Sequence, residues 1–399
     1  MRPVAPTERP CLAAALVAAA FILAACPAAP PPPDTLSLTP VRFAELPGWG
    51  DDSHAAAVPA FRRSCDRFGQ LPDEWALEPG DIGGIAADWR APCAAAAALV
   101  EGDDAAARAF FEHWFTPLKA ANGEESTGLF TGYYEAELRG ARRPGGRYTV
   151  PVYGRPSDLV AADLGLFDKA WTGRRIAGRV VDGALRPYDT RAEIEAGALQ
   201  GQGVELVWVD DFIDAFLLHV QGSGRVFLED GSVMRVGFAE SNGHPFHAIG
   251  RELVRTGQLS REEVSMPSIL DWLRAHPDEA RALMAKNPRY IFFRELEGEG
   301  PIGAQGVALT PGRSLAVDPA FIPFGVPIWL DTAWPGVRDR PLRRLMVAQD
   351  AGFAIRGPVR GDVFWGYGEE AMGRAGRMNQ EGAYYLLLPR VVSGSSNRS

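Results

Sequence analysis

The last part of the chain, after Asn287, is built from short β-rich runs that glycine and proline separate. Strands of a parallel sheet would need longer crossover connections, usually helices, between them. The close spacing of these runs therefore predicts a compact β-barrel rather than a parallel sheet. The runs are GVALT, SLAVDP, VPIWLD, RLMVAQD, DVFWG and AYYLLLP.

Similar strand patterns occur earlier in the chain, where helical segments interrupt them. Strands are expected in LFTGYYEAEL, RYTVPVYG, VELVWVDD and DAFLLHVQGSG. RVFLEDGSVMRVGF predicts a hairpin that turns at Asp230 and Gly231. Helices are expected in FHAIGRELVRTG and in SREEVSMPSILDWLRAHPDEARALMAKNP, where Ser260 and Glu263 fit a capping box and Pro277 suits a first helical turn.

The region 54–121 is expected to be helical. Asp103 and Asp104 are candidate N-cap residues of the segment DDAAARAFFEHWFTPL. Its aromatic residues recur at helical spacing, so we expect them in the core: Phe110, Phe111, Trp114 and Phe115. Together with the strands, these segments predict a mainly β protein with flanking helices.

Length and charge limit the organisation and the partners. A chain of 399 residues is too long for one ordinary core, so about two domains are expected. The formal net charge is −9 and no basic block occurs anywhere in the chain. Binding to nucleic acid through neutralisation of phosphates is therefore not expected.

The N-terminus has the features of a secretion signal. Arg2 and Arg9 precede the apolar run LAAALVAAAFILAAC, which is too short to span a membrane. The run ends at Cys26 in a sequence that resembles the lipobox of bacterial lipoproteins. Residues 1–25 are thus expected to be removed, Cys26 to be acylated, and residues 26–40 to form a proline-rich tether. The alternative is an ordinary signal peptide in which Cys26 is incidental.

Two further cysteines remain after processing, Cys65 and Cys93. In an oxidising compartment such a pair predicts one disulfide, with two free thiols as the alternative. His244 and His247 are spaced as metal ligands can be, but Pro245 lies between them and no third ligand is near in sequence. We therefore expect no metal site, and no cofactor.

Two aspartates dominate the stretch AQDAGFAIRGPVRGDVFWGYG, Asp350 and Asp362. No histidine, cysteine or lysine lies between them, so the stretch holds carboxylates without a conventional base or nucleophile. Aspartate beside glycine is also common turn chemistry, and turns between short strands are the simpler explanation. The chain has no phosphate-loop, dinucleotide, serine-hydrolase or zincin motif that opens a suitable element.

Longer segments give a specific resemblance. GRSLAVDPAFIPFGVPIWLDT and LMVAQDAGFAIRGPVRGDVFWG resemble the three-aspartate domain, a double-psi β-barrel, whose aspartates are here Asp318, Asp350 and Asp362. LFTGYYEAEL, HVQGSGRVFLEDGSVMRVGFAESNG and NPRYIFFRE look like the core of the membrane-bound lytic murein transglycosylase A family. The resemblance covers about residues 125–390. The chain departs from the family pattern at Phe353, where a glycine is usual, and at Glu381, where a proline is common.

The resemblance implies two interleaved domains. The double-psi barrel domain would comprise residues 41–137 and 288–395, including the N-terminal helices. A smaller β-domain, residues 138–287, would be inserted into it, and a groove between the two would hold a glycan strand.

The resemblance also implies a reaction, cleavage of the β-1,4 bond between N-acetylmuramic acid and N-acetylglucosamine of peptidoglycan. The muramyl C6 hydroxyl attacks its own C1, so the product is a 1,6-anhydro sugar and no water is used. One carboxyl group, Asp362, would act as acid and then as base. Asp350 would raise its pKa and orient it, Phe364 and Trp365 would bury it, and Asp318 would be structural.

Sugar-binding residues are implied by the same motifs: Tyr133, Tyr134, Gln221, Ser223 and Trp365, with Glu135 a weaker candidate. Strand alternation points the two tyrosines in opposite directions, so one of them could belong to the core. QGSG could also be a plain turn, and Trp365 a core residue.

The expected protein is thus a lytic exotransglycosylase, a lyase that acts on polysaccharide, although the sequence leaves exo and endo cleavage open. It would be a monomer, lipid-anchored on the periplasmic side of the outer membrane, with cell-wall synthesis or division complexes as candidate partners. Two alternatives stay open. One is a non-catalytic lipoprotein that binds peptidoglycan through the same barrel, and the other is a hydrolytic muramidase with a second carboxylate that activates water.

Overall fold

The structure is a computed structural model that describes residues 34–80, 82–171, 174–298, 300–337 and 339–395. The predicted signal peptide, Cys26 and the tether up to residue 33 lie outside the described residues. The tether was expected to reach residue 40, but Leu36–Pro40 form strand β1, which pairs antiparallel with β2 (Phe115–Asn122). The reason is local alternation, because Leu36 and Leu38 both pack against the core.

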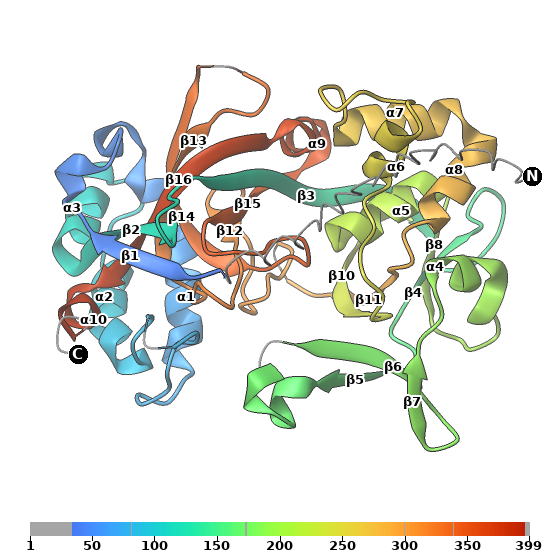
Figure 1. Cartoon of the computed structure of the whole chain (residues 1–399), viewed down its shortest axis with the longest axis horizontal. Helices are drawn as coiled ribbons and strands as arrows, with labels where there is room; N and C mark the ends of the chain where they lie inside the picture. The colour runs from blue at the N-terminus through green and yellow to red at the C-terminus, as the bar shows by residue number, and fades with distance from the viewer. Residues whose placement is uncertain (1–33, 81, 172–173, 299, 338, 396–399) are drawn as a thin grey trace, which may run out of the picture. The chain divides into compact units, whose positions relative to one another are not determined.

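A closed barrel forms the centre of the described chain. Its strands are β3 (Gly128–Ala141), β12 (Ser314–Ala316), β13 (Pro327–Ala333), β14 (Pro341–Asp350), β15 (Arg360–Tyr367) and β16 (Asn379–Pro389). They follow one another in the order β16-β13-β14-β12-β15-β3, and β3 pairs with β16 to close the ring (Figure 1). The predicted double-psi β-barrel is confirmed. One predicted strand is wrong, since GVALT forms only an isolated bridge between Ala308 and Ile302.

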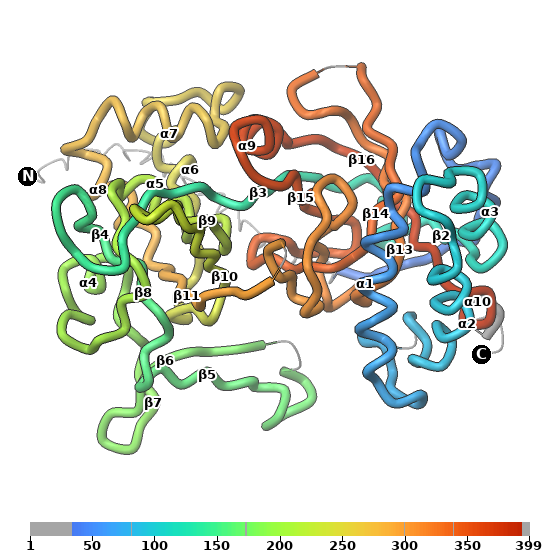
Figure 2. The backbone as a smooth tube through the Cα atoms, turned by 180° about the vertical axis from the view of Figure 1, so that it is seen from behind, coloured from blue at the N-terminus to red at the C-terminus, as the bar shows by residue number. Residues whose placement is uncertain are grey.

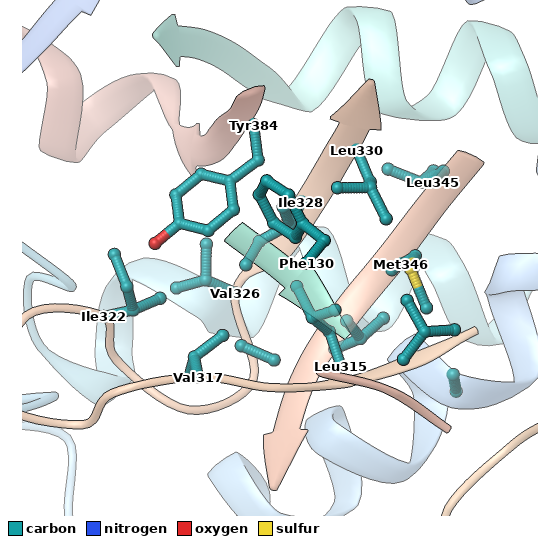
Figure 3. Packing of buried hydrophobic residues seen from close by; sticks show 14 of the residues in the cluster. Phe130, Leu315, Val317, Ile322, Val326, Ile328, Leu330, Leu345, Met346 and Tyr384 are labelled. Carbon is teal, nitrogen blue, oxygen red and sulfur yellow. The ribbon is translucent and has the colours of Figure 1, made fainter. Parts of the chain in front are cut away.

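The interior of the barrel is apolar and fully packed. Inward-facing residues of several strands meet there, as Figure 3 shows for Phe130, Leu315, Ile328, Leu330 and Tyr384. All five are excluded from solvent. This core fixes the register of the strands, because a shift by one residue would turn every apolar side chain outward.

Three helices pack beside the barrel: α1 (Val58–Gly69), α2 (Ala86–Ala97) and α3 (Asp104–Trp114). Asp103 caps α3 as predicted, by accepting a hydrogen bond from the Ala106 amide. Cys65 in α1 and Cys93 in α2 form the predicted disulfide. The helical prediction for 54–121 is wrong at its end, because Phe115–Asn122 are strand β2, paired on both sides.

The inserted domain begins within β3. From Ala136 onward this strand leaves the barrel and pairs with β8 (Glu205–Val209) and β9 (Ser223–Leu228). Figures 1 and 2 both show β3 running from the barrel strands into the insert. The other strands of this sheet are β4 (Val150–Tyr153), β10 (Val233–Ser241) and β11 (Ile291–Leu296). Judged by these pairings, the insert is longer at both ends than the expected residues 138–287.

One predicted strand in the insert is a helix. DAFLLHVQGSG, residues 214–224, covers most of α5 (Phe212–Gln221) and the start of β9. The Asp211 carboxylate caps the helix by accepting from the amides of Ile213 and Asp214, and Gly222 ends it with a positive φ of 82°. These two caps outweigh the β propensity of the apolar run between them.

The remaining elements complete the two domains. The Asp230-Gly231 hairpin joins β9 and β10 as predicted. Ser260 and Glu263 exchange the hydrogen bonds of a capping box, yet the helix begins only after Ser265, whereas Pro277 opens a helix as predicted. The elements are β5 (Val160–Asp163), β6 (Arg175–Val181), β7 (Ala184–Pro187), α4 (Arg191–Glu193), α6 (Ile249–Arg255), α7 (Met266–Ala275), α8 (Pro277–Ala285), α9 (Gly368–Arg377) and α10 (Arg390–Ser395). Over the described ranges, the helices are too short or too polar for a membrane span.

Candidate active site

The barrel brings Asp350 and Asp362 to the same place. Asp350 ends β14 and Asp362 lies near the start of β15, and Ala316 of β12 pairs with both. The two aspartates therefore lie on either side of one short strand, with Cα atoms about 10 Å apart. Each carboxylate interacts electrostatically with the same tyrosine, Tyr133.

Asp362 is held by a short chain of hydrogen bonds. The Thr131 hydroxyl donates to Oδ1 of Asp362 at 2.8 Å, and the Arg360 guanidinium donates to the Thr131 hydroxyl at 2.8 Å. Thr131 lies directly opposite Asp362 in the β3–β15 ladder, which fixes this geometry. Within the described chain, no hydrogen bond engages the other oxygen, Oδ2. Asp362 is only partly buried, as Asp350 is. Oδ2 is therefore the oxygen of Asp362 that its protein contacts leave for a ligand.

The surroundings of Asp362 favour its neutral form. Burial raises its pKa to about 6, the nearby charge of Asp350 adds to the rise, and Arg360 and the Thr131 hydrogen bond oppose it. At pH 7 a carboxyl group with this pKa is protonated in about a tenth of molecules, against on the order of one in a thousand for an ordinary aspartate. Asp362 can therefore serve both as a proton donor and as a proton acceptor near neutral pH.

Asp350 is supplied with more donors. Its carboxylate accepts hydrogen bonds from the Tyr133 hydroxyl at 2.7 Å and from the amides of Ala304 and Ala351, each at 2.9 Å. Burial raises the pKa of Asp350, and these three hydrogen bonds oppose the rise. Three donors on two oxygens also fix the carboxylate in position, so it is poorly placed to act as a mobile acid.

Asp318 lies apart from this pair. It is buried, and its carboxylate accepts from the amides of Gly357 at 2.8 Å and Ala320 at 3.1 Å. Arg356 lies 3.4 Å from the same carboxylate. These contacts tie down the loop between β14 and β15, whose two ends carry Asp350 and Asp362.

The two tyrosines of TGYYE point to opposite sides, as strand alternation predicts. Tyr133 faces the aspartates through its hydroxyl and packs against Phe364 at a ring distance of 5.3 Å. Tyr134 belongs to the main core, and its amide donates to the Gln221 side chain at 3.0 Å. Gln221 ends α5 and Ser223 opens β9, so the motif QGSG is the helix-to-strand junction that abuts β3 rather than a plain turn.

The other predicted contact residues lie away from the aspartates. Trp365 is 5% exposed and packs against Trp334, on the opposite side of β15 from Asp362 and Phe364. The prediction that Trp365 helps to bury Asp362 is therefore wrong, whereas Phe364 packs with Tyr133 on the aspartate side. Glu135 is fully buried and forms two ion pairs, with Arg225 at 2.7 Å and with Arg235 at 3.2 Å, which indicate a structural role.

Three site residues were missed in the sequence: Thr131, Arg360 and Ala304. A signal for two of them was present. Thr131 precedes Tyr133 by two positions and Arg360 precedes Asp362 by two, so strand alternation places each pair on one face. Ala304 contributes only its backbone amide from a loop, and residue type carries no signal for such a contact.

Among the described residues, no group of three or more His, Cys, Asp or Glu side chains is placed to hold a metal ion. His244 binds the carbonyl oxygen of Tyr188 at 2.7 Å, and His247 faces Glu252 at 3.3 Å.

A cavity of about 180 Å³ in the insert is lined in part by Arg191, and neither aspartate lines it.

Comparisons with known proteins match both parts of the chain. Residues 129–294 match the family described as the MltA specific insert domain, and residues 313–388 match the 3D domain. Membrane-bound lytic murein transglycosylase A of Escherichia coli K12 is 32% identical over 276 residues, 67% of each chain. The Vibrio cholerae protein of the same name is 31% identical over 269 residues, and this match spans 65% of each chain, just under two thirds.

Solved structures agree. A membrane-bound lytic murein transglycosylase from Agrobacterium tumefaciens is 34% identical, with a TM-score of 0.80 over 90% of this chain and 99% of that one. MltA from Neisseria gonorrhoeae is 32% identical, with a TM-score of 0.72 over 89% of this chain and 91% of that one. Escherichia coli MltA with bound chitohexaose is 25% identical, with a TM-score of 0.62 over 90% of this chain and 92% of that one.

Proposed function

Because the chain belongs to the membrane-bound lytic murein transglycosylase A family, we propose that it cleaves peptidoglycan between N-acetylmuramic acid and N-acetylglucosamine without water. It is a lytic transglycosylase, a mainly β enzyme with a double-psi barrel and an inserted domain. The observation that carries the mechanism is the pair of aspartates at the barrel, of which Asp362 has an oxygen without a hydrogen bond among the described residues, whereas both oxygens of Asp350 accept one.

In the first half of the proposed reaction, the Asp362 carboxyl group donates its proton to the glycosidic oxygen. The bond between this oxygen and the muramyl C1 breaks, and the N-acetylglucosamine hydroxyl leaves. In the second half, the Asp362 carboxylate takes the proton from the muramyl C6 hydroxyl while O6 bonds to C1. The product is a 1,6-anhydro end, Asp362 is again protonated, and no water is consumed.

Thr131 and Arg360 position the acid. The Thr131 hydroxyl holds Oδ1 of Asp362 and is itself held by Arg360, so Oδ2 is the oxygen left to carry the proton. The opposing effects of burial and Arg360 bring the pKa of Asp362 to about 6, between the values that suit an acid and a base near neutrality. The negative charge of ionised Asp350 raises the pKa of Asp362 and so favours its protonated form.

The hydrolytic alternative needs a second carboxylate that is free to activate a water molecule. Asp350 is a candidate near Asp362, but its carboxylate already accepts hydrogen bonds from two amides and a tyrosine hydroxyl, which hold it in place and leave few lone pairs for a water molecule. The non-catalytic alternative gives no reason for a carboxyl group with a raised pKa and an open oxygen. Both arguments favour the transglycosylase. As contacts for the sugar we propose Tyr133, Gln221 and Ser223.

The decisive experiment is digestion of purified sacculi followed by mass spectrometry of the muropeptides. We expect products that are one water lighter than those that lysozyme releases from the same sacculi. Release of reducing ends would favour the muramidase, and binding without release would favour the non-catalytic alternative. The distribution of fragment lengths over time tests the expected exolytic action.

Attachment to the membrane is assigned to Cys26. Relatives of the chain are named membrane-bound, and Cys26 follows an apolar run of the lipoprotein type. We propose acylation of Cys26 and an anchor on the periplasmic side of the outer membrane. Cys26→Ala should move the protein from membranes to the soluble periplasmic fraction without loss of activity on isolated sacculi. A variant that still pellets with membranes and resists salt would contradict this assignment.

A further inference from the structure

A solvent-exposed aromatic ring, Phe353, follows Asp350 by three residues. Phe353 is 47% exposed, although three residues earlier the chain is anchored at Asp350. The guanidinium of Arg289 lies 4.4 Å from the centre of the Phe353 ring, and the guanidinium of Arg356 lies 5.7 Å from it. Arg289 comes from the insert and Phe353 from the barrel loop, so the cluster joins the two domains beside the site.

Arg289 carries a charge without an acidic partner. Its guanidinium donates to the carbonyl oxygen of His244 at 3.2 Å, and among the described residues no carboxylate lies within ion-pair distance of it. Glu240, the acidic residue that acts on Arg289 electrostatically, is itself paired with Arg175. Burial lowers the pKa of Arg289 to about 10, a value at which it is still charged at neutral pH.

Arg356 adds a second positive charge that solvent can reach. Its side chain is 59% exposed, and one of its nitrogens lies 3.4 Å from the buried carboxylate of Asp318. Thus two guanidinium groups flank one exposed ring in a chain whose net charge is −9. Guanidinium groups hold carboxylates in a bidentate geometry, and a phenyl ring offers an apolar face. The cluster is complementary to an anionic peptide.

Peptidoglycan supplies such a group. Its N-acetylglucosamine rings are neutral, but its muramyl residues carry peptides with free carboxylates and small apolar side chains. Phe353 lies three residues from Asp350, so their Cα atoms are at most about 11 Å apart. A peptide on a muramyl residue bound near Asp362 can reach across this distance.

We propose that Phe353, Arg289 and Arg356 form a subsite for the carboxylate-bearing peptide of a muramyl residue next to the cleaved bond. This inference rests on the proposed function. It predicts that the enzyme binds peptide-bearing glycan strands more tightly than peptide-free strands of the same length. The rival explanation is a purely structural contact, in which Phe353 and Arg289 hold the barrel loop against the insert.

The test measures binding rather than turnover. Labelled glycan strands of one length are prepared with their peptides and, after amidase treatment, without them, and binding is followed by fluorescence anisotropy in the Asp362→Asn background. Arg289→Gln removes the charge but keeps a donor for the His244 carbonyl. We expect this variant to bind peptide-bearing strands about 3- to 10-fold more weakly and peptide-free strands as before. The loss corresponds to the free energy of one partly exposed charge-assisted contact.

Two further variants separate the explanations. Phe353→Gly should weaken binding of peptide-bearing strands alone. Arg281→Gln is the matched control, because Arg281 stacks over Phe212 at 4.1 Å in the same domain but far along the chain from the barrel loop, and it should change neither affinity. Equal losses on both kinds of strand in Arg289→Gln and Phe353→Gly would overturn the subsite and favour the structural contact.

The outcome can be separated from that of the proposed function. If wild-type enzyme released no anhydro products while Arg289→Gln still showed the selective loss, the reaction would be wrong and the peptide subsite would stand. If anhydro products formed but both variants bound both strands as the parent does, the subsite alone would be wrong. The parent's preference for peptide-bearing strands should also fade with added salt, whereas binding by Arg289→Gln, which lacks this charge, should depend less on salt.

Discussion

The end of β14 and the start of β15 each place one aspartate beside Ala316, yet the two carboxylates differ in what surrounds them. Burial raises the pKa of both. Asp350 accepts three hydrogen bonds and Asp362 accepts one. Burial alone therefore does not distinguish the two groups. The number of donors that each strand end and its neighbours supply decides which carboxylate is fixed and which can exchange a proton.

This difference has a structural origin. β14 runs into a loop whose amide at Ala351 turns back onto Asp350, and a second loop adds the amide of Ala304. Asp362 sits inside the β3–β15 ladder, where the backbone amides are already used between the strands. A side chain, Thr131, is then the donor available to it. Strand position thus separates an anchored carboxylate from a reactive one.

The largest effect is expected when the reactive carboxyl group is removed. Asp362→Asn keeps the size of the side chain and can keep a hydrogen bond with Thr131, but it removes the proton that both half-reactions use. General acid–base catalysis is typically worth about 10² to 10⁴-fold, and we expect a loss at or above the upper end. The measurement is release of anhydro-muropeptides, with circular dichroism and glycan-strand binding as controls for folding and for the site. Substantial turnover by the folded variant would move the acid to Asp350.

A smaller loss is expected when the anchored carboxylate is neutralised. In Asp350→Asn the carbonyl can still accept from the amides of Ala304 and Ala351, and the amide nitrogen can donate to the Tyr133 hydroxyl. Removal of the negative charge should lower the pKa of Asp362, and each unit of decrease costs about tenfold in the protonated fraction at pH 7. The activity lost at pH 7 should be partly regained at lower pH. A loss greater than that of Asp362→Asn would reverse the roles of the two residues.

The pH profile sharpens the comparison further. The pKa of Asp362 is raised, so the acid form persists up to about pH 6 and kcat/KM should fall above that pH. The Thr131 hydrogen bond lowers this pKa, so Thr131→Val, which keeps the shape of the side chain, should shift the falling limb to higher pH. We expect a several-fold loss of kcat at the optimum from poorer positioning, with KM little changed. An unshifted profile would mean that Thr131 does not act on Asp362. Thr131→Ser, which keeps the hydroxyl, should restore the profile.

Much of the barrel could be predicted from the sequence, because its strands alternate and are separated by glycine and proline. The assignment of Asp362, Asp350 and Asp318 came from the resemblance, not from periodicity. Alternation would also have identified Thr131 and Arg360, had it been applied outward from Tyr133 and Asp362. It would have separated Trp365 from the site as well, because residues 362 and 365 face opposite sides of the same strand.

The predictions that failed concern features set by interactions that local sequence patterns do not show. The apolar run of α5 is compatible with strand or helix, and the caps at Asp211 and Gly222 decide for the helix. The reach of β3 through both domains places the insert boundary inside one strand, where composition does not change. The contact between Arg289 and Phe353 joins two distant segments, and only the folded chain brings them together.

The smallest effect on activity is expected from the disulfide, which lies among the N-terminal helices and touches neither strand end. Cys65 and Cys93 are 28 positions apart, so removing the bond with Cys65→Ser and Cys93→Ser should cost about 3 to 4 kcal/mol on the chain-entropy model. Denaturant unfolding measures this loss, and thiol labelling of the unreduced, denatured wild type should find both cysteines blocked. The folded double variant should keep the pH profile of the parent, because the hydrogen bonds that distinguish Asp362 from Asp350 come from β3, β15 and two barrel loops. A shifted profile would mean that the helices help to set the barrel register, and the contrast between the two aspartates would then depend on more than their own strands.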